Sequence, residues 1–370
     1  MLGVTWRKIM NSISEISASL KKVYAALQDE ESQIIYMNMV NYFFSGDIRY
    51  ILQRGHFNNH KKDLDSSAYS ISDFILNHQH NKRDEIIVYG ANDFNSAVVN
   101  SFRNIGIDVK YFCDFNQNKQ NRMKDGLPVI SPTDVVEHHK NSIVLFTNHN
   151  HDVSRIIKLG LTHGMNQNQF KIPHPFGKIY FGLREIVPYE NEIFLDCGSY
   201  TGNTVMNFLS WNKGKYKKIY AIEPEHTSYT ILQQNMLIKN VKHIRLLNEG
   251  VWSCSDTFPF YQDGEMSSFC KDAYFLSPSL THARVNTIDN IVHTDLVTFI
   301  KMDIQGGELE ALKGAADTIK RSKPRLAISV YHKTKDIIEI PLFIHNLVPE
   351  YRFFIRQHTF LTDDTVLYAI

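Results

Sequence analysis

The sequence has no long apolar run and no excess of either charge. No stretch approaches the roughly 18 apolar residues that a membrane helix needs, and the first twenty residues lack the apolar core of a secretory signal. Lysine and arginine number 40 against 39 aspartates and glutamates, so no broad basic surface for nucleic acid or anionic lipid is expected. We therefore expect a cytoplasmic protein that neither inserts into a membrane nor binds nucleic acid.

Cysteine is also scarce and irregularly spaced. The chain has 4 cysteines and no C-x-x-C pair, so neither a disulfide framework nor a zinc site built on thiolates is expected. Cys113 and Cys197 fall in apolar, strand-like stretches, where a reduced buried thiol is the ordinary interpretation. His149 and His151 have no third ligand placed with them, so metal binding there is not expected either.

Periodicity divides the chain into four segments. Residues 1–80 carry apolar residues at helical intervals and predict an N-terminal helical segment, with a break at Gly46 and a polar loop over 56–70. Residues 81–170 alternate short apolar strands with helices, which predicts a small Rossmann-like α/β domain. Residues 171–190 are predicted to be a linker because of their prolines, and residues 191–370 a second, longer α/β domain.

Seven strands are predicted in the last segment. In chain order they are Ile193–Asp196, Ile219–Ile222, Ile244–Leu247, Val297–Met302, Leu326–Tyr331, Arg352–Ile355 and Thr365–Ala369. Helices fill most gaps, so most strands should run parallel, whereas a short turn at 362–364 makes the last one antiparallel. The predicted class is α/β, with a seven-stranded mostly parallel sheet, and segment 251–290 is expected to be hairpin or loop.

The first of these strands ends in a glycine-containing turn. A dinucleotide fingerprint needs G-x-G-x-x-G so that a pyrophosphate can approach the backbone, but here Gly198 and Gly202 are four residues apart. The wider turn suits a ligand without phosphate. The helix N-terminus after Gly202 attracts a carboxylate, and Asp196 is placed to accept a hydrogen bond from an ammonium group.

Ionisable side chains follow three further strands, and ligands of open parallel sheets bind beyond the carboxyl ends of strands. Glu223 is placed to accept both hydroxyls of a ribose. Asp303 suits three roles: orienting a hydroxyl, steadying a sulfonium or binding a divalent metal, with Glu308 opening the next helix. His332 should lie next to Asp303, where an imidazole can remove a proton.

These segments resemble the FkbM-type S-adenosylmethionine-dependent methyltransferases. The stretches that carry the resemblance are FLDCGSYTGNTV, YAIEPE, FIKMDIQGGELEALKGA and LAISVYHK, in this order and at this spacing. The opening helices, with LQDEESQIIYMNMVNYFFSGDIRYI, look like the leader of longer members. The resemblance implies a class I methyltransferase sheet and S-adenosylmethionine as donor. It also implies transfer to an oxygen of a sugar, glycan or related metabolite, as in polysaccharide modification.

The resemblance also assigns residues. Asp303 and Glu308 match the first Asp and last Glu of the family's D-x-E-G-x-E motif. From their places at the ends of neighbouring strands, Asp303 and His332 are the expected catalytic residues. Gln305 stands where that motif usually has Glu, so dependence on a divalent metal stays open. Asp196, Gly198 and Gly202 match the family's first cofactor motif, and Glu223 matches its ribose-binding acid. Ser199 and Tyr200 replace the commoner Ala and Asn, and the Tyr200 ring is expected to pack on the donor. These six are the expected cofactor-binding residues.

Other interpretations stay open on the sequence. A nicotinamide-dependent oxidoreductase is disfavoured because neither α/β segment has G-x-G-x-x-G, and the change at Gln305 leaves room for a non-catalytic binding or assembly protein. Within 85–165, Asp114 occupies a ribose-acid position, but the loop from Gly90 has lost its later glycines. That segment favours a scaffold or partner-docking domain over a second nucleotide site, and homo-oligomer formation is left undecided.

Overall fold

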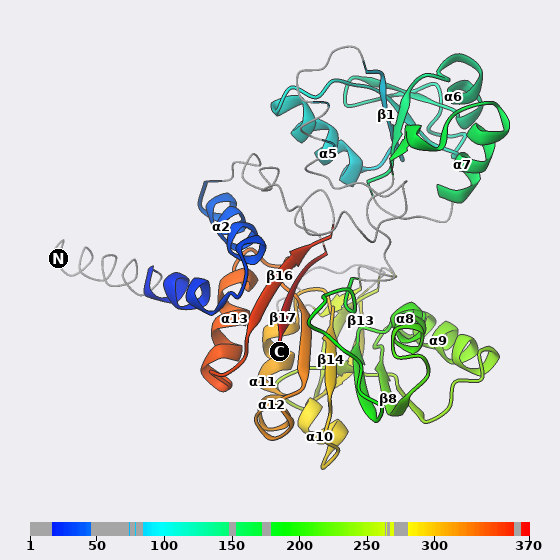
Figure 1. Cartoon of the computed structure of the whole chain (residues 1–370). Helices are drawn as coiled ribbons and strands as arrows, with labels where there is room; N and C mark the ends of the chain where they lie inside the picture. The colour runs from blue at the N-terminus through cyan, green and yellow to red at the C-terminus, as the bar shows by residue number, and fades with distance from the viewer. Residues whose placement is uncertain are drawn as a thin grey trace. The chain divides into compact units, whose positions relative to one another are not determined.

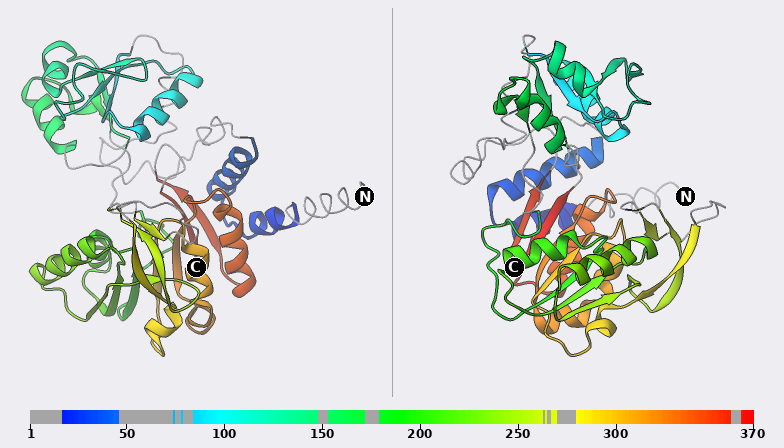
Figure 2. Two further views of the ribbon diagram at one scale, coloured as in Figure 1. Left: turned by 180° about the vertical axis from the view of Figure 1, so that it is seen from behind. Right: turned by 90° about the vertical axis from the view of Figure 1, so that its right-hand side faces the viewer.

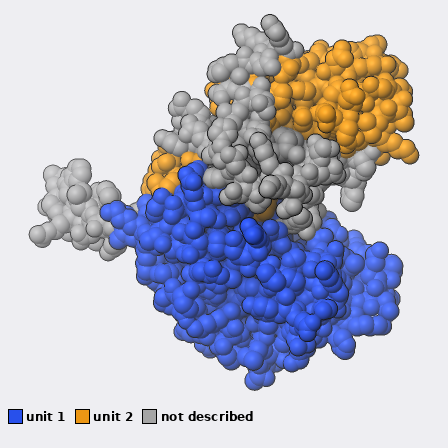
Figure 3. Space-filling view, viewed as in Figure 1, with its two compact units in different colours: residues 1–36, 177–356, 364–370 blue, residues 37–176, 357–363 orange. Residues whose placement is uncertain are grey.

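The computed structural model describes residues 17–45, 74, 78, 84–147, 153–171, 179–262, 264, 267–269, 280–358 and 364–370. The chain divides into two compact units (Figure 3): unit 1 comprises Met1–Tyr36, Gly177–Arg356 and Asp364–Ile370, and unit 2 comprises Met37–Phe176 and Gln357–Asp363. Several expectations lie outside the described residues. They concern the break at Gly46, the loop over 56–70, His149 and His151, residues 172–178 of the expected linker, and most of the turn at 362–364.

Unit 2 contains a six-stranded sheet in the order β3-β4-β2-β1-β5-β6. All its neighbouring strands pair in parallel except β3 and β4, which are antiparallel. The strands are β1 (Ile86–Tyr89), β2 (Val109–Cys113), β3 (Met123–Lys124), β4 (Leu127–Ile130), β5 (Ile143–Leu145) and β6 (Phe170–Lys171). The helices are α5 (Asp93–Asn104), α6 (Pro132–His138), α7 (Val153–Thr162) and the 3-10 helix η2 (Gln167–Gln169).

The central strand β1 is buried on both faces, which explains its uninterrupted apolar sequence. Ile86 and Val88 lie in one apolar cluster of unit 2, and Ile87 and Tyr89 lie in another. Successive side chains of a strand point to opposite faces, so the two clusters are the two cores of this sheet. The α5 helix starts at Asp93 because the Asn92 side chain caps it by accepting a hydrogen bond from the Asn95 N–H.

Unit 1 is built on a seven-stranded sheet in the order β16-β17-β15-β14-β7-β8-β9. Its strands are β7 (Glu192–Cys197), β8 (Tyr216–Ile222), β9 (Ile244–Leu247), β14 (Phe299–Met302), β15 (Arg325–Ser329), β16 (Phe353–Gln357) and β17 (Thr365–Ala369). Strands β15, β14, β7, β8 and β9 pair in parallel, and β17 is antiparallel to β15. Each of the seven predicted strands overlaps one of these, and the sheet is mixed.

Helices connect the strands of this sheet and cover both of its faces (Figures 1 and 2). From β7 and β14 the chain moves outward in opposite directions, and right-handed crossovers then place the two sets of helices on opposite faces. The first set is α8 (Asn203–Trp211) and α9 (His226–Ile238); the second is α11 (Glu308–Lys313), α12 (Ala316–Ser322) and α13 (Asp336–Leu347). This is a Rossmann-like arrangement whose topological switch point lies between β7 and β14.

Between β9 and β14 the chain forms a four-stranded sheet and a short helix. The sheet has the order β10-β13-β11-β12, and β11 pairs antiparallel with β12 and β13. The elements are β10 (Gly250–Val251), β11 (Asp256–Tyr261), β12 (Ser268–Phe269), β13 (Leu280–Asn286) and α10 (Ile288–Val292). The sequence predicted only hairpin or loop here, because β11 begins with exposed polar residues and contains Pro259.

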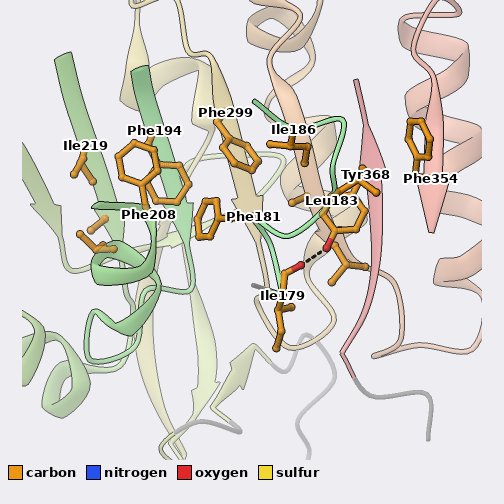
Figure 4. Close-up of a cluster of buried hydrophobic side chains, with 14 of the residues drawn as sticks. Ile179, Phe181, Leu183, Ile186, Phe194, Phe208, Ile219, Phe299, Phe354 and Tyr368 are labelled. Carbon is orange, nitrogen blue, oxygen red and sulfur yellow. Dashed lines mark hydrogen bonds between the residues drawn. The ribbon is translucent and has the colours of Figure 1, made fainter. Parts of the chain in front are cut away.

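Residues 179–186 belong to the core of unit 1, although the sequence assigned 171–190 to a linker. The Phe181 ring lies 5.2 Å from that of Trp211 and 5.4 Å from that of Phe299, and the Tyr368 hydroxyl donates a hydrogen bond to the Ile179 carbonyl (Figure 4). The prolines that suggested a linker flank this stretch, whose buried Ile179, Phe181 and Leu183 alternate with more exposed residues as in a strand although no strand forms.

The N-terminal part of unit 1 covers the edge strand β16. Residues 17–26 are helical, and α2 (Glu30–Ser45) follows. The Ile355 N–H donates to the Ser32 hydroxyl at 2.9 Å, and the Arg356 guanidinium contacts the Asp29 carboxylate at 2.6 Å. These contacts occupy a strand edge that would otherwise be open to pairing. Among the described residues, no helix has the length and apolar character needed to cross a membrane.

Candidate functional site

The ionisable residues singled out from the sequence meet at one edge of the unit 1 sheet. His332 follows β15, Asp303 follows β14, Asp196 lies near the end of β7 and Glu223 follows β8. These four strands are neighbours and run parallel, so their carboxyl ends share one edge. The switch point between β14 and β7 lies in the middle of this set, which is where open α/β sheets bind ligands.

The turn between β7 and α8 passes directly against the end of β14. Gly198 has a φ of +77°, and a Cβ atom at this position would lie 2.0 Å from the carbonyl oxygen of Asp303. The Asp303 N–H donates to the Cys197 carbonyl at 3.1 Å. Both the backbone conformation and the lack of space therefore require glycine here. The turn holds the ends of the two central strands together.

Glu223 is oriented by two backbone donors. The Tyr200 N–H donates to Oε2 at 2.8 Å, and the Glu225 N–H donates to Oε1, also at 2.8 Å. A carboxylate has about four lone-pair positions, so two remain for donors on a ligand. Burial raises the pKa of Glu223 to about 7, although the two backbone hydrogen bonds act in the opposite direction. The acid is thus fixed in place by a turn that follows the neighbouring strand.

Ser199 and Gly202 shape this turn. The Ser199 hydroxyl donates to the Asp196 carbonyl at 3.0 Å and accepts from the Ile222 N–H at 3.1 Å, which ties β7 to β8. Gly202 is the N-cap of α8 with a φ of +96°, and a Cβ atom there would lie 2.6 Å from Cε of Met236 on α9. Ser199 is 2% exposed, so its side chain acts within the protein.

Asp196 pairs with a buried lysine that the sequence analysis missed. Lys301 Nζ lies 3.1 Å from Asp196 Oδ1, and it also donates to the carbonyls of Cys197 and Gly198 at 3.2 and 2.7 Å. The side chains are 2% and 0% exposed, and burial raises the pKa of Asp196 against the pull of Lys301. The ammonium group that contacts Asp196 in this structure is therefore that of Lys301. A lysine within an apolar strand was the available signal.

Asp303, His332 and Glu308 form a chain of charged contacts. His332 Nε2 lies 3.3 Å from Asp303 Oδ1, and His332 Nδ1 lies 2.9 Å from Glu308 Oε1. Burial alone would lower the pKa of His332, but the hydrogen bond to Glu308 and the negative charges of Glu308, Asp303 and Asp336 outweigh it and raise that pKa to about 9. The imidazole thus lies beside Asp303, as the strand order indicates, with both nitrogens directed at carboxylates.

Tyr180 is a second residue that the sequence analysis missed. Its hydroxyl donates to Asp303 Oδ2 at 2.7 Å, and Lys301 Nζ lies 5.2 Å from the centre of its ring. Burial and the charge of Asp303 raise the pKa of the phenol well above its usual value, so Tyr180 remains a donor. It lies in the segment interpreted as a linker and belongs to no motif, so the sequence offered no signal.

Asp303, Glu308 and His332 are also the residues that would suit a cation. Each offers one ligand atom, and these atoms lie within 4.8 Å of one another. Two carboxylates and an imidazole are acceptable ligands for several divalent metals. In this structure, however, the same atoms pair with one another. Gln305 adopts a left-handed conformation with a φ of +57° and adds an amide where a carboxylate was expected.

Residues 196–361 match the family model of the methyltransferase FkbM domain. Among solved structures, a methyltransferase FkbM from Methylobacillus flagellatus KT is 21% identical and has a TM-score of 0.49, covering 82% of this chain and 94% of that one. An rRNA methylase from Streptococcus thermophilus is 16% identical (TM-score 0.33; 50% and 87% covered). A putative methyltransferase from Streptococcus mutans, in complex with SAH, is 15% identical (TM-score 0.29; 50% and 92% covered). No curated protein matches the chain.

Proposed function

We propose that this chain, whose residues 196–361 match the methyltransferase FkbM domain, transfers a methyl group from S-adenosylmethionine to a hydroxyl of a sugar, glycan or related metabolite. The observation that supports this best is the geometry of Glu223. Two backbone N–H groups orient its carboxylate and leave two lone-pair positions for the two hydroxyls of a ribose. The adjoining turn lacks the glycine spacing for a pyrophosphate, as suits an adenosyl donor.

The turn from Gly198 to Gly202 forms a second part of the proposed donor site. Its shape is set by Gly198, by the buried hydroxyl of Ser199 and by Gly202 at the start of α8. The N-terminus of α8 would hold the donor's carboxylate, and the Tyr200 ring would pack on the donor, where an aromatic ring stabilises a sulfonium. Asp196 acts through Lys301, which holds the Gly198 carbonyl.

Asp303 is the proton acceptor in this proposal. Bound S-adenosylmethionine would supply an activated methyl group: the acceptor oxygen bonds to the methyl carbon as the carbon–sulfur bond breaks, and S-adenosylhomocysteine leaves. The hydroxyl proton passes to Asp303, because both nitrogens of His332 already face carboxylates and the Asp303 side chain is 19% exposed, against 8% for His332. Tyr180 and His332 fix the orientation of that carboxylate, and alignment of this kind supplies several kcal/mol of a barrier.

Calorimetric titration with S-adenosylmethionine tests the donor site. Glu223→Ala should weaken binding at least tenfold, since each hydrogen bond to a charged acceptor contributes about 1.5–3 kcal/mol. Glu190→Ala is the matched control, because that side chain is 81% exposed, and it should bind as the unmodified protein does. An affinity unchanged by Glu223→Ala would show that the donor site is elsewhere.

Incubation with labelled donor and fractionated cell glycans tests the reaction. We expect one fraction to gain label, and Asp303→Asn should slow the transfer by about 10²–10⁴ while S-adenosylhomocysteine affinity stays within about threefold. If no glycan or metabolite fraction gains label although the donor binds, the chain would be a binding protein that retains the fold.

Chelation tests whether a divalent cation takes part. A cation held by Asp303, Glu308 and His332 would orient the acceptor hydroxyl and favour its ionisation. Because these three side chains already pair with one another and Gln305 replaces a carboxylate, we expect methyl transfer to survive dialysis against EDTA. Loss of transfer that Mg²⁺ or Mn²⁺ restores would assign the three side chains to a metal.

A further inference from the structure

Unit 2 repeats, around Asp114, the hydrogen bonds that surround Glu223 in unit 1. Asp114 follows β2, the parallel neighbour of β1, just as Glu223 follows the parallel neighbour of β7. The Ala91 N–H, in the turn after β1, donates to Asp114 Oδ2 at 2.9 Å, and the Asn116 N–H donates to Oδ1 at 2.9 Å. In unit 1 the corresponding donors are the Tyr200 N–H, in the turn after β7, and the Glu225 N–H, two residues after Glu223.

The two turns also begin in the same way. Gly90 has a φ of +97°, and its N–H donates to the Cys113 carbonyl of the neighbouring strand at 2.7 Å. Gly198 has a φ of +77°, and its N–H donates to the Ile222 carbonyl at 3.0 Å. In unit 2, β1 lies between β2 and β5, so this turn also stands at a topological switch point, where such sheets bind ligands.

The carboxylate of Asp114 has room for a vicinal diol. Three of its roughly four lone-pair positions are used, by the two backbone donors and by Lys119 Nζ at 3.0 Å from Oδ2. The Lys119 side chain is 41% exposed, and an ion pair with an exposed partner contributes little. A ligand hydroxyl can therefore replace Lys119 on Oδ2 while a second hydroxyl occupies the open position on Oδ1.

The same turn excludes a dinucleotide. Asn92 occupies the place of the second glycine of a G-x-G-x-x-G motif, and its side chain caps α5 through the Asn95 N–H. The Asn95 amide donates to the carbonyls of Tyr89 and Gly90 and fills the space beside the turn, since a Cβ atom on Gly90 would lie 2.7 Å from Asn95 Nδ2. A pyrophosphate has no glycine backbone to approach here.

We propose that unit 2 binds a ribonucleoside or ribonucleoside monophosphate, whose 2′ and 3′ hydroxyls donate to Asp114. This site is separate from the donor site of unit 1, and it changes the sequence-based interpretation of residues 85–165 as a scaffold. A purely structural role for Asp114, in which its bonds only hold the turn, is the alternative. The two roles differ in whether binding depends on the ligand's 2′ hydroxyl.

The test uses the full chain carrying Glu223→Ala, so that the unit 1 site does not contribute. Calorimetric titrations with AMP, GMP, CMP and UMP should reveal binding of at least one of them. Its 2′-deoxy analogue should bind about tenfold more weakly, because one hydrogen bond to a charged acceptor is lost. Absence of binding by all four at millimolar concentration, or equal binding of the ribo and deoxy forms, would overturn the proposal.

A variant pair locates the binding. Asp114→Asn should weaken the bound monophosphate about tenfold or more, whereas Asp108→Asn should leave it unchanged, because the Asp108 side chain is 48% exposed and pairs only with Lys110 among the described contacts. Unchanged binding in folded Asp114→Asn protein would contradict the proposal. If circular dichroism shows that this variant does not fold, the comparison of ribo and 2′-deoxy ligands on the chain carrying Glu223→Ala still tests the proposal. Neither titration uses S-adenosylmethionine, so failure here is distinguishable from failure of the methyltransferase proposal.

Discussion

At the scale of single residues, Glu223 should couple donor binding to pH. Burial raises its pKa to about 7, and hydroxyl donors bind an ionised carboxylate better than a neutral one. Binding therefore favours the deprotonated form, and affinity should fall as pH drops below about 7. We expect S-adenosylmethionine to bind roughly tenfold more weakly at pH 6 than at pH 8, measured by calorimetry. Glu223→Gln removes the titrating group and should abolish the difference, whereas a difference that persists would implicate another group.

The buried pair of Lys301 and Asp196 should be important for stability. Lys301→Met leaves the Asp196 carboxylate, which is 0% exposed, without its cation, and losing one partner of a buried ion pair costs about 3–5 kcal/mol. Urea unfolding followed by circular dichroism measures this loss. The control is Lys215→Met, whose pair with Glu190 is exposed and contributes below about 1 kcal/mol. Equal effects of the two substitutions would contradict the buried-pair interpretation.

The sequence was informative about residues at the ends of strands and silent about their partners. Glu223, Asp303 and His332 each follow an apolar run, so the sheet topology alone brings them to one edge. Lys301 pairs with Asp196, and Tyr180 pairs with Asp303. Both pairings depend on packing between segments distant in the chain. Neither pairing leaves a periodic signal in the sequence.

At the scale of elements, the turn between β7 and α8 depends on glycine for two separable reasons. Gly198 and Gly214 both have positive φ, but a Cβ atom meets the Asp303 carbonyl at Gly198 and nothing within 4 Å at Gly214. Gly214→Ala should lower the free energy of unfolding by about 1–2 kcal/mol, because alanine is strained in the left-handed conformation. Gly198→Ala should cost a further ~1–3 kcal/mol for the clash and weaken S-adenosylmethionine binding. Thermal unfolding and calorimetry compare the two, and equal costs would contradict the close approach.

Regular, buried elements were predictable, and partly exposed ones were not. The strands of the seven-stranded sheet appear in the sequence as apolar runs because helices cover both faces of that sheet. The hairpin expected within 251–290 is present as the antiparallel pair β11 and β12, but the four-stranded sheet around it was not predicted, because its strands are short or partly exposed.

At the scale of the whole molecule, the two units should unfold as separate transitions. Each has its own buried core, with Phe102 and Phe146 in unit 2 and Phe194 and Phe208 in unit 1, and chains with several cores depart from two-state unfolding. Differential scanning calorimetry should show two peaks. S-adenosylhomocysteine at 100 times its dissociation constant should stabilise the unit 1 peak alone, by about 2.7 kcal/mol. One cooperative peak, or an equal shift of both, would contradict this.

The distribution of tryptophan provides a means of observing the units separately. The chain has 3 tryptophans, and none occurs between residues 37 and 176 or between 357 and 363, the segments that form unit 2. Trp211 lies among the aromatic rings around Phe181, and Trp252 is 6% exposed. Fluorescence excited selectively from tryptophan therefore reports on unit 1 alone, because unit 2 contains no tryptophan. A fluorescent label introduced into unit 2 would then be an energy acceptor with no competing donor in its own unit.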